Sequence, residues 1–223
     1  MPGGERRDVF ITGGTGFMGR ALIAELVERG FAVRALVRRG LEAKLPRGCE
    51  AVPGDPLDGT TFADAVRAAD TFVQLVGIPG PWTARRLKAV DLASVRESVK
   101  VATTAGVRHF VYVSVAHPAP VMRAYIHVRM QGEALIRAAD FNATILQPWY
   151  VLGPGRRWPM LLNPIYWMAE RFPPTREGAR RLGLITRDEM LSALAEAVEK
   201  PADGIRVMTV EDIRASHERR DGA

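Results

Sequence analysis

The apolar residues of the chain fall into short runs rich in Val, Ile, Phe and Thr. These runs are separated by segments in which apolar positions recur every three or four residues. The short runs predict buried strands, and the longer spacing predicts amphipathic helices. The expected strands are residues 9–12, 32–37, 50–53, 71–76, 109–115, 143–146 and 204–210. The expected helices are residues 16–29, 59–69, 83–105, 122–139 and 186–199.

Strands and helices alternate along most of the chain. Because parallel strands need a crossover between them, this order predicts right-handed βαβ units and a parallel sheet covered by helices on both faces. The first helix carries an apolar stripe that includes Leu22 and Leu26, and Gly30 is placed to end it. Thr186 and Glu189 match a capping box at the start of the helix at 186–199.

Composition bounds the class of protein. The chain has 223 residues, of which 47% are hydrophobic and 25% charged, as expected for one globular domain. Cys49 is the single cysteine, so no internal disulfide can form. The apolar core segment of a signal peptide does not follow the charged start MPGGERRD, and no stretch reaches the roughly 18 apolar residues of a membrane span. We therefore expect a cytoplasmic protein.

The net charge of +6 comes mainly from arginines scattered among acidic residues. No helix-turn-helix spacing, zinc-finger spacing or basic tail accompanies it, so no nucleic-acid partner and no metal site are expected.

Four glycines occur within seven residues of ITGGTGFMGR, between the first strand and the first helix. Two dinucleotide-binding spacings are satisfied, Gly14-x-Gly16-x-x-Gly19 and Gly13-x-x-Gly16-x-x-Gly19. Such a turn lets the backbone approach a pyrophosphate at the helix N-terminus. A merely structural glycine turn is the alternative, but the strand before it and the helix after it are the context that the motif requires. The pattern favours an NAD(P) cofactor.

The end of the second strand bears on which dinucleotide binds. An acidic residue there would hold the ribose 2′-hydroxyl of NAD, but the chain has Arg38, followed by Arg39. A guanidinium suits a 2′-phosphate and stacks on adenine, so NADP is favoured over NAD; the alternative is a solvated arginine pair. Asp55 is a candidate acceptor for the adenine amino group, and Asp58 is expected to cap the next helix.

Four segments together resemble one family. TGGTGFMG, GDPLD, VDLASVRESVKVATTAGVRHFVYVS and ATILQPWYVLGPG are similar to the short-chain dehydrogenase/reductase superfamily. The similarity is to its extended and atypical branches, with NAD-dependent epimerase/dehydratase-like and nitrogen-metabolite-repression-regulator-like members, and it covers residues 8 to about 155. It implies a Rossmann fold that binds NAD(P) across the C-terminal ends of the strands, with the loops after Val76 and Ser114 near the nicotinamide. It does not by itself name a reaction.

The resemblance also implies catalytic positions. The family uses a Tyr-x-x-x-Lys pair and a Ser or Thr, and the matching residues here are Tyr125, Arg129 and Ser114. Tyrosine would exchange a proton with the substrate, and serine would orient the substrate oxygen. Arg129 departs from the family's lysine; it keeps a cation one helical turn from Tyr125 but is not a simple replacement at the ribose.

Two further departures affect the same site. The hydroxyl that the family has one or two residues after Ser114 is replaced by Val115 and Ala116. His117 and His127 are candidate proton carriers, because an imidazole ordinarily titrates near neutrality. The alternatives are a loop residue for His117 and an outward-facing helix residue for His127.

The candidate cofactor-binding residues are Gly13, Thr15, Gly16, Phe17, Met18, Gly19, Arg38, Asp55, Val76, Gly77 and Pro148. The family's TILRPG-like stretch appears as TILQPWYVLGPG, with Gln147 and Trp149 as departures. Trp149 and Tyr150 are expected at the mouth of the nicotinamide site, which favours a flat or apolar substrate.

The character of the chain changes after residue 155. Residues 156–181 combine Trp158, Tyr166 and Trp167 with several arginines, and a short helix is expected at 163–171. This segment fits a cap over an apolar substrate, a plain core helix, or an interfacial helix or subunit contact. The tail from residue 215 is expected to be loose.

The expected fold class is α/β, a Rossmann-type doubly wound parallel sheet with a small, mainly helical C-terminal cap. Residues 1–155 form the NAD(P)-binding core and residues 156–223 the cap with a final helix and strand, in one continuous domain. The favoured function is NADP-dependent oxidoreduction of a small apolar carbonyl, alcohol or alkene. A non-catalytic redox sensor and an assembly or membrane-associated accessory protein are the alternatives. Peripheral membrane contact stays open, as do a monomer and a dimer.

Overall fold

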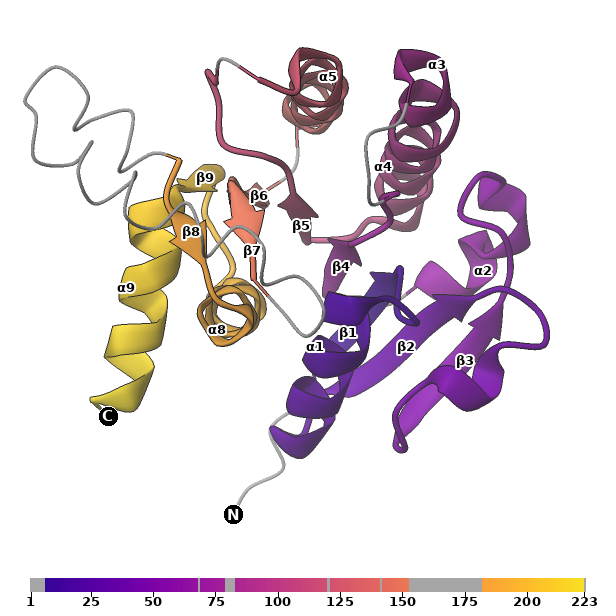
Figure 1. The fold of residues 1–223 in the computed structure, drawn as a ribbon. Coiled ribbons are helices and arrows are strands. Elements are labelled where there is room, and N and C mark those ends of the chain that lie inside the picture. Colours follow the sequence, from indigo (N-terminus) through magenta and orange to yellow (C-terminus); the bar gives the residue numbers. More distant parts are fainter. Residues whose placement is uncertain are drawn as a thin grey trace, which may run out of the picture.

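A computed structural model describes residues 7–67, 69–78, 83–119, 121–140, 142–152 and 182–222. Its centre is a seven-stranded parallel sheet in the order β3-β2-β1-β4-β5-β6-β9 (Figure 1). The strands are β1 Asp8–Thr12, β2 Ala32–Val37, β3 Cys49–Pro53, β4 Thr71–Gln74, β5 His109–Val113, β6 Asn142–Leu146 and β9 Ile205–Met208. A separate pair joins β7 Tyr150–Val151 to β8 Leu184–Ile185. The predicted α/β fold class is confirmed.

The strand order reverses between β1 and β4. The chain moves outward from β1 through β2 to β3, then returns to place β4 on the other side of β1. At this switch point Thr12 Oγ1 donates to Gln74 Oε1, and Gln74 Nε2 donates to Ser94 Oγ at 3.1 Å. Open parallel sheets bind ligands outside the carboxyl ends of the strands at such a reversal.

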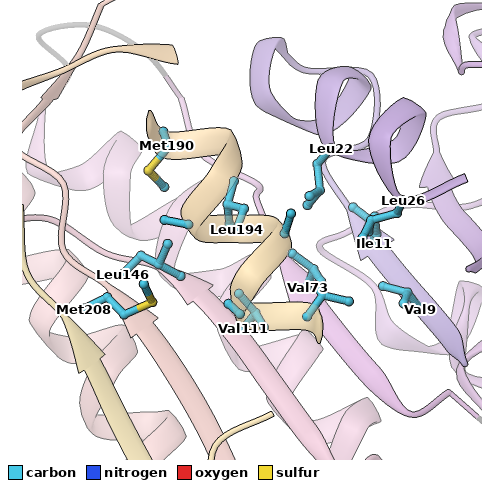
Figure 2. Packing of buried hydrophobic residues seen from close by; sticks show 14 of the residues in the cluster. Val9, Ile11, Leu22, Leu26, Val73, Val111, Leu146, Met190, Leu194 and Met208 are labelled. Atoms are coloured by element: carbon cyan, nitrogen blue, oxygen red, sulfur yellow. The ribbon is translucent and has the colours of Figure 1, made fainter. Parts of the chain in front are cut away.

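Two groups of helices enclose the sheet. One apolar cluster joins the sheet to α1 Phe17–Glu28, α8 Arg187–Glu199 and α9 Val210–Asp221. The other joins it to α2 Ala63–Val66, α4 Ala93–Ala105 and α5 Arg123–Ala138. Figure 2 shows α8 lying across the strands, with Leu194 between Leu22 of α1 and Leu146 of β6. Burial on both faces explains why the central strands β1, β4, β5 and β6 are mostly buried and mainly apolar, whereas the edge strands β3 and β9 are less buried.

Most predicted elements occur, with shifted ends. β4 stops at Gln74 and β5 at Val113, two residues earlier than expected. The segment predicted as one helix over 83–105 consists of α3 Ala84–Leu87, a π-helical turn at Lys88–Leu92, and α4. The expected helices at 16–29, 122–139 and 186–199 correspond to α1, α5 and α8.

The helix predicted over 59–69 is wrong. The described part of that segment forms a 3₁₀ turn at Gly59–Thr61 and the four-residue α2. Asp58 accepts from Thr60 N at 3.1 Å, as expected of a cap, and Thr61 Oγ1 donates to the Asp58 carbonyl at 2.7 Å. These local side-chain bonds compete with a regular helix at its start. A further 3₁₀ turn spans Glu42–Lys44.

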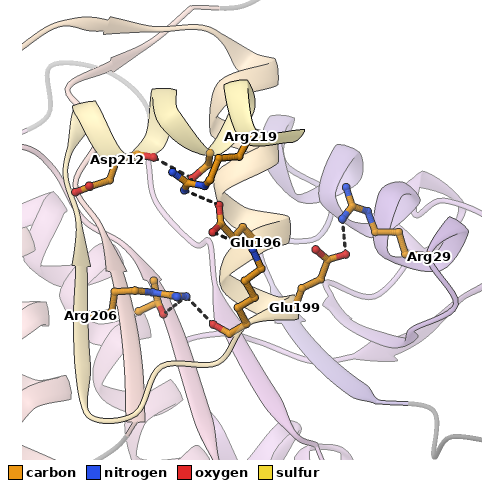
Figure 3. Close-up of polar contacts among 9 residues, drawn as sticks. Arg29, Glu196, Glu199, Arg206, Asp212 and Arg219 are labelled. Carbon is orange, nitrogen blue, oxygen red and sulfur yellow. Dashed lines mark hydrogen bonds and ion pairs between the residues drawn. The ribbon is translucent and has the colours of Figure 1, made fainter. Parts of the chain in front are cut away.

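The prediction of a loose tail is also wrong. Thr209 and Asp212 form a capping box that opens α9, and Ile213 is fully buried. Arg219 pairs with Glu196 of α8 at 2.9 Å, while Arg29 of α1 pairs with Glu199 (Figure 3). These contacts join residues distant in sequence, so the tail's polar composition did not indicate them.

The C-terminal part contributes to the core, because β9 pairs with β6 and α8 packs on the sheet. The division at residue 155 stays a prediction. The expected helix at 163–171 and its aromatic residues lie outside the described residues. None of the helices within the described ranges has the length and apolar character to cross a membrane.

His109 gives the fold a predicted dependence on pH. The side chain is 1% exposed, and its Nε2 lies 3.0 Å from Thr144 Oγ1. Burial lowers the pKa of His109 from 6.5 to about 4, with a further contribution from the charge of Arg206. The unfolded chain therefore binds this proton first as pH falls. The free energy of unfolding therefore keeps the whole contribution of neutral His109 above about pH 6.5. It decreases by about 3 kcal/mol as the pH approaches 4.

Urea unfolding between pH 4 and 7 tests this expectation. The His109→Gln variant should lose most of this slope, whereas His127→Gln, which alters an exposed histidine, should keep it. An unchanged slope in His109→Gln would assign the acid sensitivity to other groups.

Candidate functional site

The glycine-rich turn connects β1 to α1 with almost no free space. Gly13 has φ of +78°, a left-handed conformation that favours glycine. A Cβ at Gly19 would lie 2.3 Å from the Gly13 carbonyl oxygen and 2.8 Å from Gly14 Cα. Gly16 N donates to the same Gly13 oxygen at 3.0 Å. A Cβ at Gly14 would lie 2.9 Å from the Ala35 Cβ, and one at Gly16 would lie 3.1 Å from the Gly13 carbonyl oxygen. All four glycines of the turn are therefore required sterically, and both predicted spacings are compatible with the structure.

The first turn of α1 is suited to an anion. Gly16 is the N-cap residue, no side chain caps the helix, and the first turn contains no acidic residue. Phe17 is 37% exposed, while Thr15 and Met18 are half-buried. Backbone N–H groups at a helix start normally require acceptors, and a diphosphate supplies them. The cradle therefore fits the diphosphate of a dinucleotide.

The residues predicted to contact the adenosine part of the cofactor follow the ends of β2 and β3. Arg38 and Arg39 are exposed immediately after β2. Asp55 is exposed after β3, and its Oδ1 accepts from Leu57 N at 2.9 Å. This bond leaves the second carboxylate oxygen for another donor. The roles of Arg38 and Asp55 toward a ligand stay predictions.

Tyr125 and Arg129 lie one turn apart on α5 and contact each other. The guanidinium carbon of Arg129 is 5.1 Å from the Tyr125 ring centroid, and Tyr125 is half-buried. Arg129 is 6% exposed; it donates to Asp91 Oδ1 at 2.8 Å and to the Val113 carbonyl at 3.1 Å. The cation is therefore held beside the tyrosine by a buried ion pair.

The charges in this pair affect one another. Burial raises the pKa of Asp91, and the positive charge of Arg129 opposes that rise. Burial lowers the pKa of Arg129, but the neighbouring Tyr125, Tyr112 and Asp91 outweigh it and raise the pKa above its ordinary value. Arg129 therefore stays charged, and unlike a lysine it has no accessible neutral form.

Ser114 belongs to a second buried network. It is 2% exposed, and its Oγ donates to Glu133 of α5. Gln147 Nε2 donates to the two oxygens of Glu133 at 2.9 and 3.2 Å, and His117 Nε2 lies 3.4 Å from the same carboxylate. The Ser114 hydroxyl proton is thus committed to Glu133. A direct role of Ser114 toward substrate stays a prediction.

The remaining predicted cofactor residues lie where the strands end. Val76 is half-buried and Gly77 exposed after β4, and a Cβ on Gly77 would lie 2.3 Å from an Arg129 nitrogen. Pro148 is buried after β6, and its carbonyl accepts from Ala116 N at 2.9 Å. The structure therefore brings Gly77 to Arg129 and Pro148 to the loop after β5.

Two aromatic residues expected at the site mouth have other contacts. Trp149 is half-buried and packs against the apolar cluster that contains α1 and α8. Tyr150 lies in β7, opposite Leu184. Their placement at the nicotinamide stays a prediction.

A pocket of about 220 Å³ lies at the start of α5. Its lining includes His117, Arg123 and His127, together with the apolar Ile126 and Met130. His127 is exposed, as its place on the helix predicted, whereas half-buried His117 contacts both this pocket and the Glu133 network. Tyr125 does not line this pocket, although the next residue, Ile126, does.

Sequence reasoning missed Asp91 and Glu133. Glu133 follows Tyr125 and Arg129 at successive four-residue intervals, so helical periodicity alone could have placed the three on one face. Asp91 also lies four residues before Val95, which is fully buried in α4. A carboxylate on the buried face of a helix needs a partner of opposite charge, so this spacing was the sequence signal that could have identified Asp91.

Comparisons with known proteins agree with this geometry. A family model described as NAD(P)H-binding matches residues 13–156. A Caulobacter vibrioides protein named ceramide reductase is 29% identical over 218 residues, covering 96% of this chain and 66% of the relative. A Stigmatella aurantiaca protein named as a 4-hydroxy-2-methyl-3-oxo-4-farnesyl-3,4-dihydroquinoline-1-oxide ketoreductase is 28% identical over 169 residues, covering 65% and 50%. The chain thus spans only about half to two thirds of these relatives.

Solved structures support the same architecture. The Bordetella bronchiseptica enzyme WbmH in complex with NAD+ gives a TM-score of 0.69 at 20% identity, covering 92% of this chain and 76% of that one. MoeE5 in complex with UDP-glucose and NAD gives 0.68 at 20% identity, covering 96% and 82%. These similarities establish the fold, and the family model covers more than half of the sequence. The chain therefore belongs to the family described as NAD(P)H-binding.

Proposed function

We propose that the protein is an NADP-dependent oxidoreductase that acts on the carbonyl, alcohol or alkene of a small, mostly apolar molecule. The observation that carries the proposal is the contact between Tyr125 and the buried cation of Arg129, which lies on the family's catalytic helix. When bound, the nicotinamide ring supplies or accepts a hydride. The residues of the chain must then handle the accompanying proton.

Tyr125 is the proposed proton donor. Proton transfer would leave a negative charge on its phenolic oxygen, and the neighbouring cation of Arg129 would stabilise that charge. Asp91 fixes the position of that cation and Gly77 leaves space for it. Arg129 is thus proposed to stabilise charge on Tyr125 without exchanging a proton itself.

Ser114 can contribute to this reaction only as a hydrogen-bond acceptor while its proton is committed to Glu133. A serine in that state can orient the hydroxyl of an alcohol or of Tyr125 through its oxygen lone pairs. It cannot donate to a carbonyl oxygen. We therefore assign proton donation to Tyr125 alone.

Two observations support an apolar substrate. The pocket at the start of α5 includes Ile126 and Met130. The two named relatives act, by their names, on ceramide and on a farnesyl-bearing quinoline, which are molecules with large apolar groups.

Turnover tests the proposed chemistry. With NADPH and a panel of apolar ketones, aldehydes and quinones, absorbance at 340 nm should fall. Tyr125→Phe should reduce the rate by at least about 100-fold while the Kd for NADPH changes less than twofold, because only the proton donor is lost. Thr104→Val, which removes a hydroxyl from an exposed position of α4, is the control and should retain the wild-type rate. A fully active Tyr125→Phe variant would exclude Tyr125 as the donor.

Cofactor preference tests Arg38. We expect wild-type protein to bind NADPH more tightly than NADH, and Arg38→Asp to remove that preference by weakening NADPH about 10- to 100-fold. Calorimetry with both dinucleotides measures the change. Arg47→Gln removes an exposed arginine from the loop before β3, at the opposite end of β2 from Arg38, and should leave the preference unchanged. Equal loss of NADPH and NADH affinity in Arg38→Asp would contradict a 2′-phosphate contact.

A non-catalytic redox sensor is the alternative. Two side chains at the family's catalytic positions already have buried partners, because Arg129 pairs with Asp91 and Ser114 donates to Glu133. Val115 and Ala116, which replace the family's second hydroxyl, are buried. These observations favour a sensor. Tight NADPH binding with no turnover of any compound in the panel would support the sensor.

A further inference from the structure

An arginine from the C-terminal part of the chain lies over the phosphate-binding turn. Arg187 is the first residue of α8, and its guanidinium carbon is 5.4 Å from the centroid of the Phe17 ring. Phe17 is the first residue of α1 and directly follows the N-cap Gly16. The two helices therefore begin beside each other, although 170 residues separate them in sequence.

The position of Arg187 is fixed by packing on both sides. Met190 and Leu194 of α8 share an apolar cluster with Leu22 of α1, and all three are almost fully buried (Figure 2). The capping box between Thr186 and Glu189 defines where α8 starts. The guanidinium is consequently held at the turn by rigid elements.

The charge of Arg187 has no partner within the described part of the chain. Its Nε is buried without a hydrogen-bond acceptor, and no carboxylate of the described residues forms an ion pair with it. Glu189 is engaged in the capping box, and Asp188 is exposed. A half-buried cation without an acceptor is unfavourable, and a ring contact alone recovers only part of the lost hydration. An anion at this place would supply the missing acceptor.

We propose that Arg187 is a second diphosphate-binding group, which donates from its guanidinium to the dinucleotide held by the glycine turn. The backbone N–H groups at Phe17 and Met18 would contact the diphosphate from the α1 side, and Arg187 would contact it from the α8 side. The Phe17 ring holds the planar guanidinium in place between these groups. Cofactor binding would then join the C-terminal part of the chain to the first βα unit.

In this proposal Arg187 contacts the diphosphate, and Arg38 contacts the 2′-phosphate of NADP. Arg38 follows β2, at the side where the adenosine ribose is expected, whereas Arg187 stands at the start of α1. Arg187 therefore acts on NAD and NADP alike and does not contribute to the choice between them. This distinguishes a diphosphate contact from a 2′-phosphate contact.

Calorimetry on the full chain tests the assignment with NADPH, ADP-ribose and adenosine 2′-monophosphate. Arg187→Met should raise the Kd for NADPH and ADP-ribose by about 10- to 100-fold, since hydrogen bonds to a charged group are lost. It should leave adenosine 2′-monophosphate unchanged. Arg38→Asp should give the reverse pattern, with ADP-ribose unaffected. Arg187→Lys, which keeps the charge but loses the planar fork, should fall between wild type and Arg187→Met.

Controls separate this proposal from the family assignment. Arg96→Met removes the same charge from an exposed position of α4 and should leave the Kd of each of the three ligands unchanged. The melting temperature of each variant reports whether the fold is intact. If wild-type protein binds ADP-ribose and a folded Arg187→Met variant binds it within twofold, the role of Arg187 is overturned while dinucleotide binding stands. If wild-type protein binds none of the dinucleotides, the cofactor assignment itself fails.

Discussion

Gly19→Ala is expected to reduce dinucleotide affinity by about 1000-fold or more. The new methyl group would lie 2.3 Å from the Gly13 carbonyl oxygen, and the obstacle is backbone, which cannot rotate away as a side chain can. The turn must move, and with it the N–H groups that open α1. Loss of two or three hydrogen bonds to a diphosphate is sufficient for an effect of this size.

Titration of NADPH into wild-type and variant protein measures this effect, with circular dichroism as the check on folding. Gly106→Ala is the matched control. Gly106 is the C-cap residue of α4 and has φ of +70°, and a Cβ there would meet no atom within 4 Å. It should lower stability by about 1 kcal/mol and leave the Kd unchanged. If Gly19→Ala binds NADPH normally, the cradle is not the diphosphate site.

Breaking the Asp91–Arg129 pair is expected to have the largest effect on stability. Both side chains are buried, with Asp91 1% and Arg129 6% exposed, so removing one partner leaves the other without compensation. Asp91→Leu should decrease the free energy of unfolding by about 3–5 kcal/mol. Single domains are typically stable by only about 5–15 kcal/mol, so this change is large.

The double variant Asp91→Leu/Arg129→Met makes the prediction specific. Because it removes both charges together, it should be more stable than Asp91→Leu alone, even though it contains one more substitution. Urea denaturation of the two single variants and the double variant gives the coupling energy. Additive losses would show that the ion pair does not determine stability. Turnover should be lost in all variants in which the cation beside Tyr125 is removed or displaced.

The buried pairs also connect stability to the proposed chemistry. Asp91 holds Arg129 beside Tyr125, and Glu133 holds the hydroxyl of Ser114. In both cases a carboxylate away from the reacting atoms determines what the neighbouring group can do. The departures from the family motif at Arg129 and Gln147 belong to these two networks, which gives them a structural reason whichever function the protein has.

The sequence by itself determined the parts of the protein that depend on neighbours along the chain. Strand and helix periodicity predicted the parallel α/β fold, and the glycine spacing predicted the turn between β1 and α1. The capping box at Thr186 was visible for the same reason, since residues three apart on a helix must meet.

Only the tertiary structure decided which distant side chains meet. Asp91 and Arg129 are 38 residues apart, Ser114 and Glu133 are 19 apart, and Arg187 reaches Phe17 across 170 residues. The polar segment after Thr209 is held as α9 because Ile213 packs in the core and Arg219 forms an ion pair with Glu196. No local pattern encodes such pairs. They are selected when packing removes water from charged groups and leaves each of them in need of a partner.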